Sequence, residues 1–169
     1  MSSPVPAWAL TAAYALHMLA TIVLVGGLFV LSVLWLPAAS RSLSAHDQAN
    51  LLRAISRRFQ PLAWLSIAVL VATGMTQMAA SPNYLGLLAI DNLWSAAMLA
   101  KHTAFGAMLA LAAYQTWVVT PTLERQALLR AADTGLEGRA ATASQQRLLR
   151  INLWIGIVIL GLTAIARTA

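Results

Sequence analysis

The sequence predicts an all-α integral membrane protein, folded as an up-down bundle of four helices, and three observations support this. Of the 169 residues, 60% are hydrophobic and only 9% are charged, whereas a soluble domain carries about 25% charged residues. The mean hydropathy is +0.73. The apolar residues gather into four runs, each long enough for the roughly 20 residues with which a helix crosses the hydrocarbon core. Unpaired backbone groups are too costly in lipid, so each run is expected to be helical.

The four predicted spans cover residues 7–36, 61–80, 92–119 and 148–166, and residues 1–169 form a single transmembrane domain. The first and third runs are longer than a bilayer requires, so we expect them to tilt or to extend beyond it. Pro61 and Pro121 are expected at span boundaries, where a missing N–H is tolerated. Before Pro61, Ser44 followed by Asp47 has the form of a helix N-cap and predicts a surface helix ahead of the second span.

The arginines predict the orientation of the spans. They fall in the first and third connections, whereas residues 81–91 contain neither lysine nor arginine. The positive-inside rule places both basic connections in the cytoplasm and both termini outside. The net charge of +6 therefore faces anionic lipid head groups, and no nucleic-acid partner is expected. The arginines concerned are Arg41, Arg53, Arg57 and Arg58 in the first connection and Arg125, Arg130, Arg139, Arg147 and Arg150 in the third.

Three basic side chains lie deep inside the predicted spans, namely His17, Lys101 and His102. Ionisable groups inside a membrane are costly and mark functional sites by default. His17 follows Trp8 by nine residues and His102 follows Trp94 by eight, which places both imidazoles about 12–14 Å below the outer aromatic belt. Spans one and three lie diagonally across a bundle of this kind, so the two histidines are expected to bind a ligand between them.

Two ligands suit this pair, copper and haem b, and the sequence leaves the choice open. Haem takes one imidazole on each face of the iron. A copper ion takes imidazole together with softer ligands, for which Met98 and Met18 are the nearest candidates. Met75 and Met78 lie near the outer mouth of the second span, where a metal ion would arrive. In a third interpretation the histidines only form hydrogen bonds between helices.

Lys101 lies about 100° around its helix from His102, and no Asp or Glu lies within a predicted span to pair with it. A bound porphyrin propionate, Tyr14, Thr73 or Asn152 would each offer a partner. Alternatively, burial leaves the amine neutral and able to carry a proton.

Gly26, Gly27 and Gly74 allow close helix packing. No catalytic residue is assigned, since no nucleotide, serine-triad or zinc-protease motif occurs; an enzyme here would be a haem-dependent membrane oxidoreductase.

Short segments resemble, in the same order, the small single-domain members of the copper resistance protein D (CopD) family. This resemblance implies a multi-pass protein of the bacterial cytoplasmic membrane linked to copper uptake or resistance, with His17, Lys101 and His102 as its polar core. A more distant similarity is to the HemJ type of protoporphyrinogen oxidase, which has a histidine on an early span and a lysine on a later one. The CopD-like segments are Leu16-His17-Met18-Leu19, Val25-Gly26-Gly27, Arg57-Arg58-Phe59, Thr73-Gly74, Leu99-Ala100-Lys101-His102 and Leu149-Arg150-Ile151-Asn152.

The expected function is therefore copper binding and handling through the intramembrane histidines. The alternatives are a b-type haem protein for electron transfer or porphyrin oxidation, and a structural or assembly subunit without a cofactor. Membrane lipid is the expected surrounding, and a membrane partner or a homo-oligomer is compatible with the sequence.

Overall fold

The structure, a computed structural model, describes residues 5–82, 84, 86, 90, 92–121 and 136–168, with the backbone alone at 45, 46, 49 and 136–142. Over these ranges the chain is helical and contains no strand. Four helices are long and apolar enough to cross a membrane, which confirms the predicted fold class. They are Ala7–Ser42, Asn50–Ala79, Leu93–Val119 and Ala143–Thr168.

The first membrane-crossing helix is one rod in which α-helix alternates with π-helix. The dihedral angles at every internal junction are helical, so the changes in winding do not break the rod. π-Helical turns are rare and are frequently found at functional sites. The segments are α1 (Ala7–Thr21), η1 (Ile22–Gly26), α2 (Gly27–Phe29), η2 (Val30–Trp35) and α3 (Leu36–Ser42).

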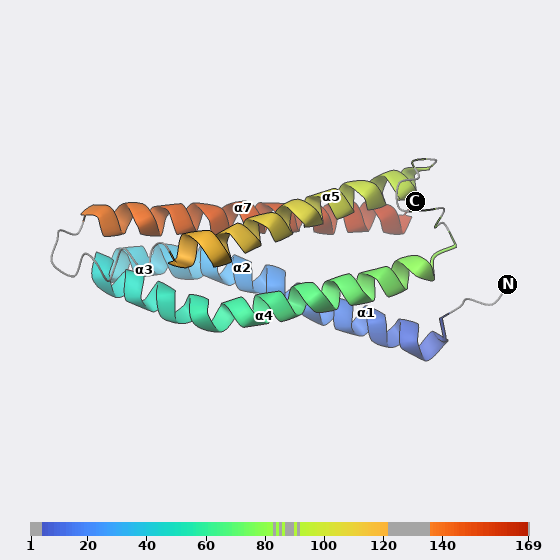
Figure 1. Ribbon diagram of the computed structural model, residues 1–169, viewed down its shortest axis with the longest axis horizontal. Coiled ribbons are helices and arrows are strands. Elements are labelled where there is room, and N and C mark those ends of the chain that lie inside the picture. Colours follow the sequence, from blue (N-terminus) through green and yellow to red (C-terminus); the bar gives the residue numbers. More distant parts are fainter. Residues whose placement is uncertain are drawn as a thin grey trace.

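The second membrane-crossing helix, α4 (Ala45–Ala79), is longer than expected. The predicted N-cap is present, since Ser44 Oγ accepts a hydrogen bond of 3.1 Å from the Asp47 N–H. No helix boundary occurs at Pro61, because this proline lies inside α4, so the segment expected as a surface helix and the second span form one continuous helix. A proline removes one helical hydrogen bond, and α4 bends along its length (Figure 1). Leu52 is only 2% exposed and packs in a core cluster with Leu149, which holds the first part of α4 in place.

The third membrane-crossing helix consists of α5 (Leu93–Tyr114) and the π-helical segment η3 (Gln115–Val119). Its start is fixed by a capping box, in which Asn92 Oδ1 accepts from the Ser95 N–H at 2.8 Å and Ser95 Oγ accepts from the Asn92 N–H at 3.1 Å. The fourth is α7 (Leu136–Thr168). Arg125 and Arg130, which entered the orientation argument, lie outside the described residues.

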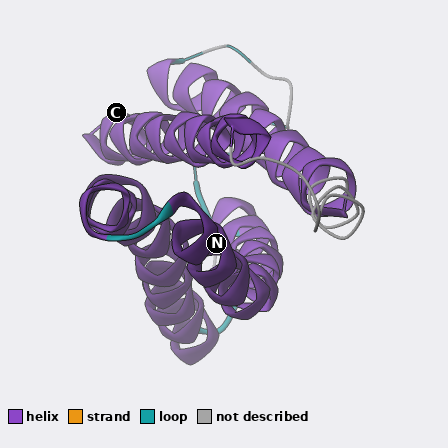
Figure 2. Cartoon of the chain, turned by 90° about the vertical axis from the view of Figure 1, so that its left-hand side faces the viewer, coloured by secondary structure: helices purple, strands orange, loops and turns teal. Residues whose placement is uncertain are grey.

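The four helices pack as two pairs, α1 with α4 and α5 with α7 (Figures 1 and 2). One core cluster joins the pairs through α2, α3, α4 and α7, and a second, formed by Leu24, Ile67 and Met108, joins η1, α4 and α5. Both ends of the chain lie at one end of the bundle, and the turn from α3 to α4 lies at the other (Figure 1). We call these the terminal end and the α3–α4 end.

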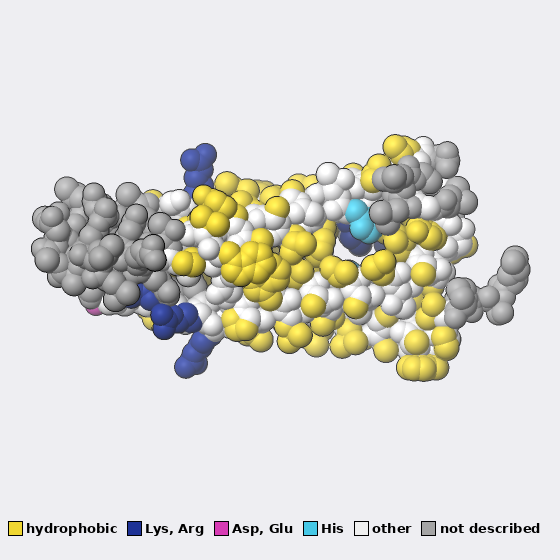
Figure 3. Space-filling model, in the orientation of Figure 1, with side chains coloured by type: hydrophobic (Ala, Val, Ile, Leu, Met, Phe, Trp, Pro, Cys, Tyr) yellow, Lys and Arg dark blue, Asp and Glu magenta, His cyan; other side chains and the backbone are white. Residues whose placement is uncertain are grey.

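Exposed arginines gather at the α3–α4 end, where Figure 3 shows basic side chains on both edges of the molecule. This is the end that the positive-inside rule assigns to the cytoplasm. The orientation itself stays a prediction. The exposed arginines described near this end are Arg41, Arg57, Arg58, Arg147 and Arg150.

Cysteine labelling tests the orientation cleanly, because the chain has no cysteine of its own. Ser42 and Thr168 are both exposed and lie at opposite ends of the bundle. In intact cells, a membrane-impermeant maleimide is expected to label Thr168→Cys and to reach Ser42→Cys only after the membrane is opened. The reverse pattern of labelling would place the termini inside.

Two neighbouring glycines provide a matched test of the packing between α2 and α4. A Cβ at Gly27 would overlap the Phe59 ring at Cε2, whereas a Cβ at Gly26 would meet nothing within 4 Å. Gly27→Ala is therefore expected to lower the thermal unfolding temperature, by roughly 2–4 °C for each kcal/mol of overpacking. Gly26→Ala is the control and should leave it unchanged or raise it, because alanine favours helix. Equal unfolding temperatures for the two variants would contradict the observed packing.

Candidate metal site near the terminal end

His17 lies on α1, is half-buried, and is held by α4. Its Nδ1 atom is 2.8 Å from Thr73 Oγ1, and Thr73 Oγ1 also donates its only proton to the Val69 carbonyl at 2.6 Å. The hydroxyl must therefore accept from His17, so that Nδ1 carries the proton of the neutral imidazole. Nε2 is then left with its lone pair, which is the form of histidine that binds a metal ion.

The surroundings of His17 bring α1 and α4 close together. The ring fits against Gly74, where a Cβ would lie 3.6 Å from His17 Cε1. A few residues away, Gln77 Nε2 donates to the Ala13 carbonyl at 3.3 Å. Gly74, expected from the sequence to allow close packing, thus lies beside the imidazole, and a Cβ there would be at an ordinary van der Waals distance from the ring. These contacts orient the ring before any ligand arrives.

His102 lies on α5 and is exposed. Its Nδ1 atom is 2.6 Å from the Met98 carbonyl one turn earlier. A carbonyl only accepts, so Nδ1 is again the protonated nitrogen and Nε2 carries the lone pair. Both histidines therefore have the same tautomer, each fixed by a different kind of acceptor.

Two basic side chains lie at this end of the bundle. Lys101 is close enough to His17, and Arg167 to Lys101, for an electrostatic interaction. Arg167 also lies over the ring of Tyr14, with 5.1 Å between the guanidinium carbon and the ring centroid, which is a cation–π contact between α7 and α1. Among the described residues, Lys101 has no hydrogen-bonding or acidic partner. Figure 3 shows an imidazole beside a basic side chain at a hollow in this half of the molecule.

The structure thus brings Lys101 near His17, as a neighbour across the bundle. The predicted methionines divide into two groups: Met18 and Met75 are 65% and 59% exposed, whereas Met78 is 7% exposed and Met98 is half-buried. The pairing of His17 with His102 through a shared ligand stays a prediction.

Sequence reasoning missed two residues of this region. Thr73 was considered as a partner for Lys101, but it bonds to His17. Arg167 was not considered, although its place in the last turn of α7 puts it at the terminal end with His17. Asn152, another candidate partner for Lys101, lines a cavity beside Ser56 and Gln145.

A metal ion at this site would have to be bound by ligands other than carboxylates and thiolates. Within the described part of the chain, no three His, Cys, Asp or Glu side chains come together as a metal-binding group. The donors expected from the sequence are two imidazole nitrogens and the thioether of Met98. Such a soft, neutral set suits Cu(I) better than Mg²⁺ or Ca²⁺, which take oxygen ligands.

Comparison with known proteins agrees with this chemistry. The model of the family described as copper resistance protein D matches residues 53–166, which include Lys101 and His102 and begin after His17. No curated protein and no solved structure matches the chain. Because the match spans more than half of the 169 residues, the chain belongs to the copper resistance protein D family.

Proposed function

We propose that this multi-pass, copper-resistance-related membrane protein binds copper directly, through Nε2 of His17 and of His102, in the cytoplasmic membrane of a bacterium. The observation that carries the proposal is that Nδ1 of each histidine is hydrogen-bonded to an oxygen, from which we infer the same tautomer for both rings. Thr73 and the Met98 carbonyl each accept a proton from Nδ1, so both histidines present a lone pair at Nε2. A hydrogen bond on the second nitrogen is the usual way in which proteins orient a metal-binding imidazole.

The positive charge of Lys101 and Arg167 argues for a weak, transient site. A cation bound by neutral ligands is repelled by unit charges nearby, and the repulsion is large where water is scarce. This repulsion would weaken the binding of a permanently bound metal cofactor. It suits a copper ion that binds briefly and is then released, and Met98 offers a soft ligand beside His102. We propose that copper is cargo here.

One observation favours the second candidate, a b-type haem protein. Lys101 and Arg167 meet no acidic partner among the described residues, and haem propionates would supply the missing negative charge. The family match links the chain to copper instead.

Purified protein distinguishes the two candidates. The chain is reconstituted in nanodiscs, equilibrated by dialysis against a saturating concentration of buffered Cu(I) under anaerobic conditions, and analysed for bound copper and for visible absorption. We expect about one copper per chain and no Soret band. A strong Soret band in the protein as isolated, without retained copper, would establish the haem alternative and overturn the proposal.

A further inference from the structure

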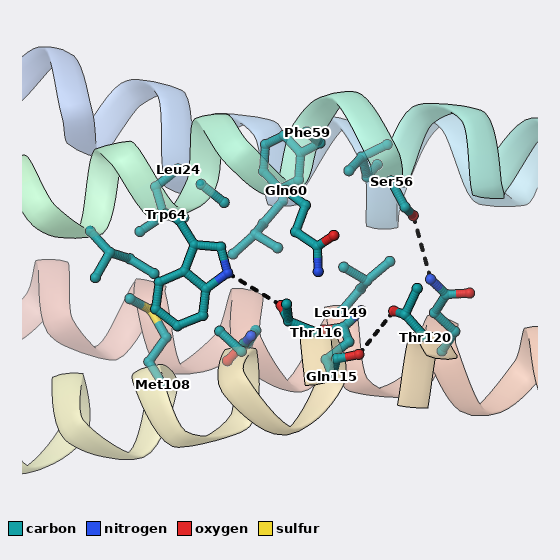
Figure 4. Close-up of a pocket in the computed structure, with 17 residues that line it drawn as sticks. Leu24, Ser56, Phe59, Gln60, Trp64, Met108, Gln115, Thr116, Thr120 and Leu149 are labelled. Atoms are coloured by element: carbon teal, nitrogen blue, oxygen red, sulfur yellow. Dashed lines mark hydrogen bonds between the residues drawn. The ribbon is translucent and has the colours of Figure 1, made fainter. Parts of the chain in front are cut away.

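A second candidate site lies farther along the bundle toward the α3–α4 end. A cavity, partly open to the outside, is lined by residues from all four membrane-crossing helices. Figure 4 shows Gln60 and Trp64 projecting from α4 into this space and Thr116 facing them. Along α4, Gln60 is thirteen residues from Thr73, which is about 20 Å. The cavity is therefore distinct from the proposed copper site.

The polar groups of this cavity are neutral. They are amides and hydroxyls, and none of the 17 lining residues is acidic, basic or histidine. Asn152 is 4% exposed, and its Oδ1, itself buried, has no hydrogen-bond partner among the described residues. A buried acceptor without a partner is costly, and rotation of the Asn152 amide toward the cavity would let a ligand that donates a hydrogen bond satisfy it.

Donors are present as well as the acceptor. Gln60, half-buried, makes no hydrogen bond to the described residues, so its NH₂ group is available. Thr116 Oγ1 accepts from Trp64 Nε1 at 3.3 Å, which leaves its own proton to donate. A ligand that matches the cavity must therefore both accept and donate hydrogen bonds while carrying no charge.

The walls of the cavity are apolar and partly aromatic, with Phe59, Trp64 and Met108 among them. A flat ring fits such surfaces. The cavity lies in the membrane-crossing part of the bundle and is partly open to the outside. A ligand that enters through this opening would come from the lipid, so an apolar tail suits it.

The π-helical segments of the chain lie next to this cavity. All three π-helical segments of the described chain border this cavity, η1 through Leu24, η2 through Leu31, and η3 through Gln115 and Thr116. A π-helical turn displaces backbone groups from the regular ladder and is common at ligand sites. In η3, Thr120 Oγ1 donates to the Gln115 carbonyl at 2.9 Å, which stabilises the altered winding beside the cavity.

We propose that this cavity binds the head group of a membrane quinol. A quinol is neutral and flat, carries an apolar tail, and has hydroxyl groups that donate to Asn152 Oδ1 and accept from Gln60 and Thr116. The oxidised quinone only accepts, so it leaves Asn152 Oδ1 unsatisfied. The site should therefore prefer the reduced form.

The test is titration calorimetry of the full chain in phosphatidylcholine nanodiscs, with decylubiquinol and decylubiquinone as probes and empty nanodiscs as the baseline. Saturable binding of decylubiquinol is expected, about tenfold tighter than that of decylubiquinone. Gln60→Leu should weaken binding of the quinol about tenfold or more. Ala112→Phe fills the cavity and should abolish it.

Two matched variants control for nonspecific effects. Gln146→Leu replaces a half-buried glutamine outside the cavity, and Ala110→Phe adds a ring on the exposed side of α5; both should bind as the wild type does. His17→Ala should also bind normally, which separates this proposal from the copper site. Binding that is absent in the wild type, or equal in Ala112→Phe and Ala110→Phe, would overturn the proposal. So would equal affinity for the two redox forms, or full competition by a hydrocarbon chain, which would indicate a slot for lipid tails.

Discussion

Replacing His17 by alanine is expected to reduce copper binding by at least about a hundredfold, because it removes one of two imidazole donors from a site with few others. Thr73→Val keeps the shape of the side chain but removes the oxygen that accepts from Nδ1. The ring then loses its fixed tautomer and orientation, and affinity should fall about 10- to 100-fold. Both effects are measured by competition for Cu(I) against a chelator of known affinity.

The control for these variants is His46→Ala, which removes the remaining histidine, located in the first turn of α4 at the α3–α4 end. It should bind copper as the wild type does. The structural interpretation, in which His17 only links α1 to α4 through Thr73, makes a different prediction. If His17 has only this structural role, Thr73→Val and His17→Ala should lower the unfolding temperature and leave the affinity for copper unchanged.

Replacing Lys101 by methionine is expected to tighten copper binding. Lys101 lies near His17, and two unit charges about 10 Å apart repel each other by about 2 kcal/mol at an effective dielectric constant near 20. Removing that charge should raise the affinity for Cu(I) about 10- to 30-fold. Methionine retains most of the length and apolar contact of the lysine stem.

Lys101→Arg is the matched control, since it preserves the charge and should give no such gain. The sign of the methionine effect also separates the two candidate cofactors. A haem protein would use Lys101 to hold a propionate, so Lys101→Met would lower haem occupancy. A copper affinity that falls or stays constant in Lys101→Met would contradict the proposed repulsion.

The sequence predicted the fold class correctly because apolar length alone determines it. Runs of about 20 apolar residues have no stable alternative to helix in lipid. The sequence signals for the ends of individual helices were less reliable. The Ser44 cap was recognisable from its side-chain chemistry, but Pro61 was misread as a boundary. Whether a proline ends a helix depends on tertiary packing, here the contacts of Leu52 with α7, and those contacts are not visible in the sequence pattern.

The sequence also predicted the ionisable residues of the candidate site, but not the residues that they contact. His17, Lys101 and His102 stood out because polar residues are rare within apolar spans. Their partners did not stand out. Thr73 is a small residue whose role depends on the rotation of α4, and the proximity of Arg167 depends on how α7 packs. The cavity was not predicted, since its amides come from three helices and no single segment carries a motif.

Copper K-edge X-ray absorption of the Cu(I)-loaded protein tests the central claim most directly, because it counts the imidazole nitrogens bound to the metal. The wild type should show scattering from two imidazoles, and His17→Ala and His102→Ala should each show one fewer. A His102→Ala spectrum identical to that of the wild type would contradict the claim that the two histidines hold the ion together.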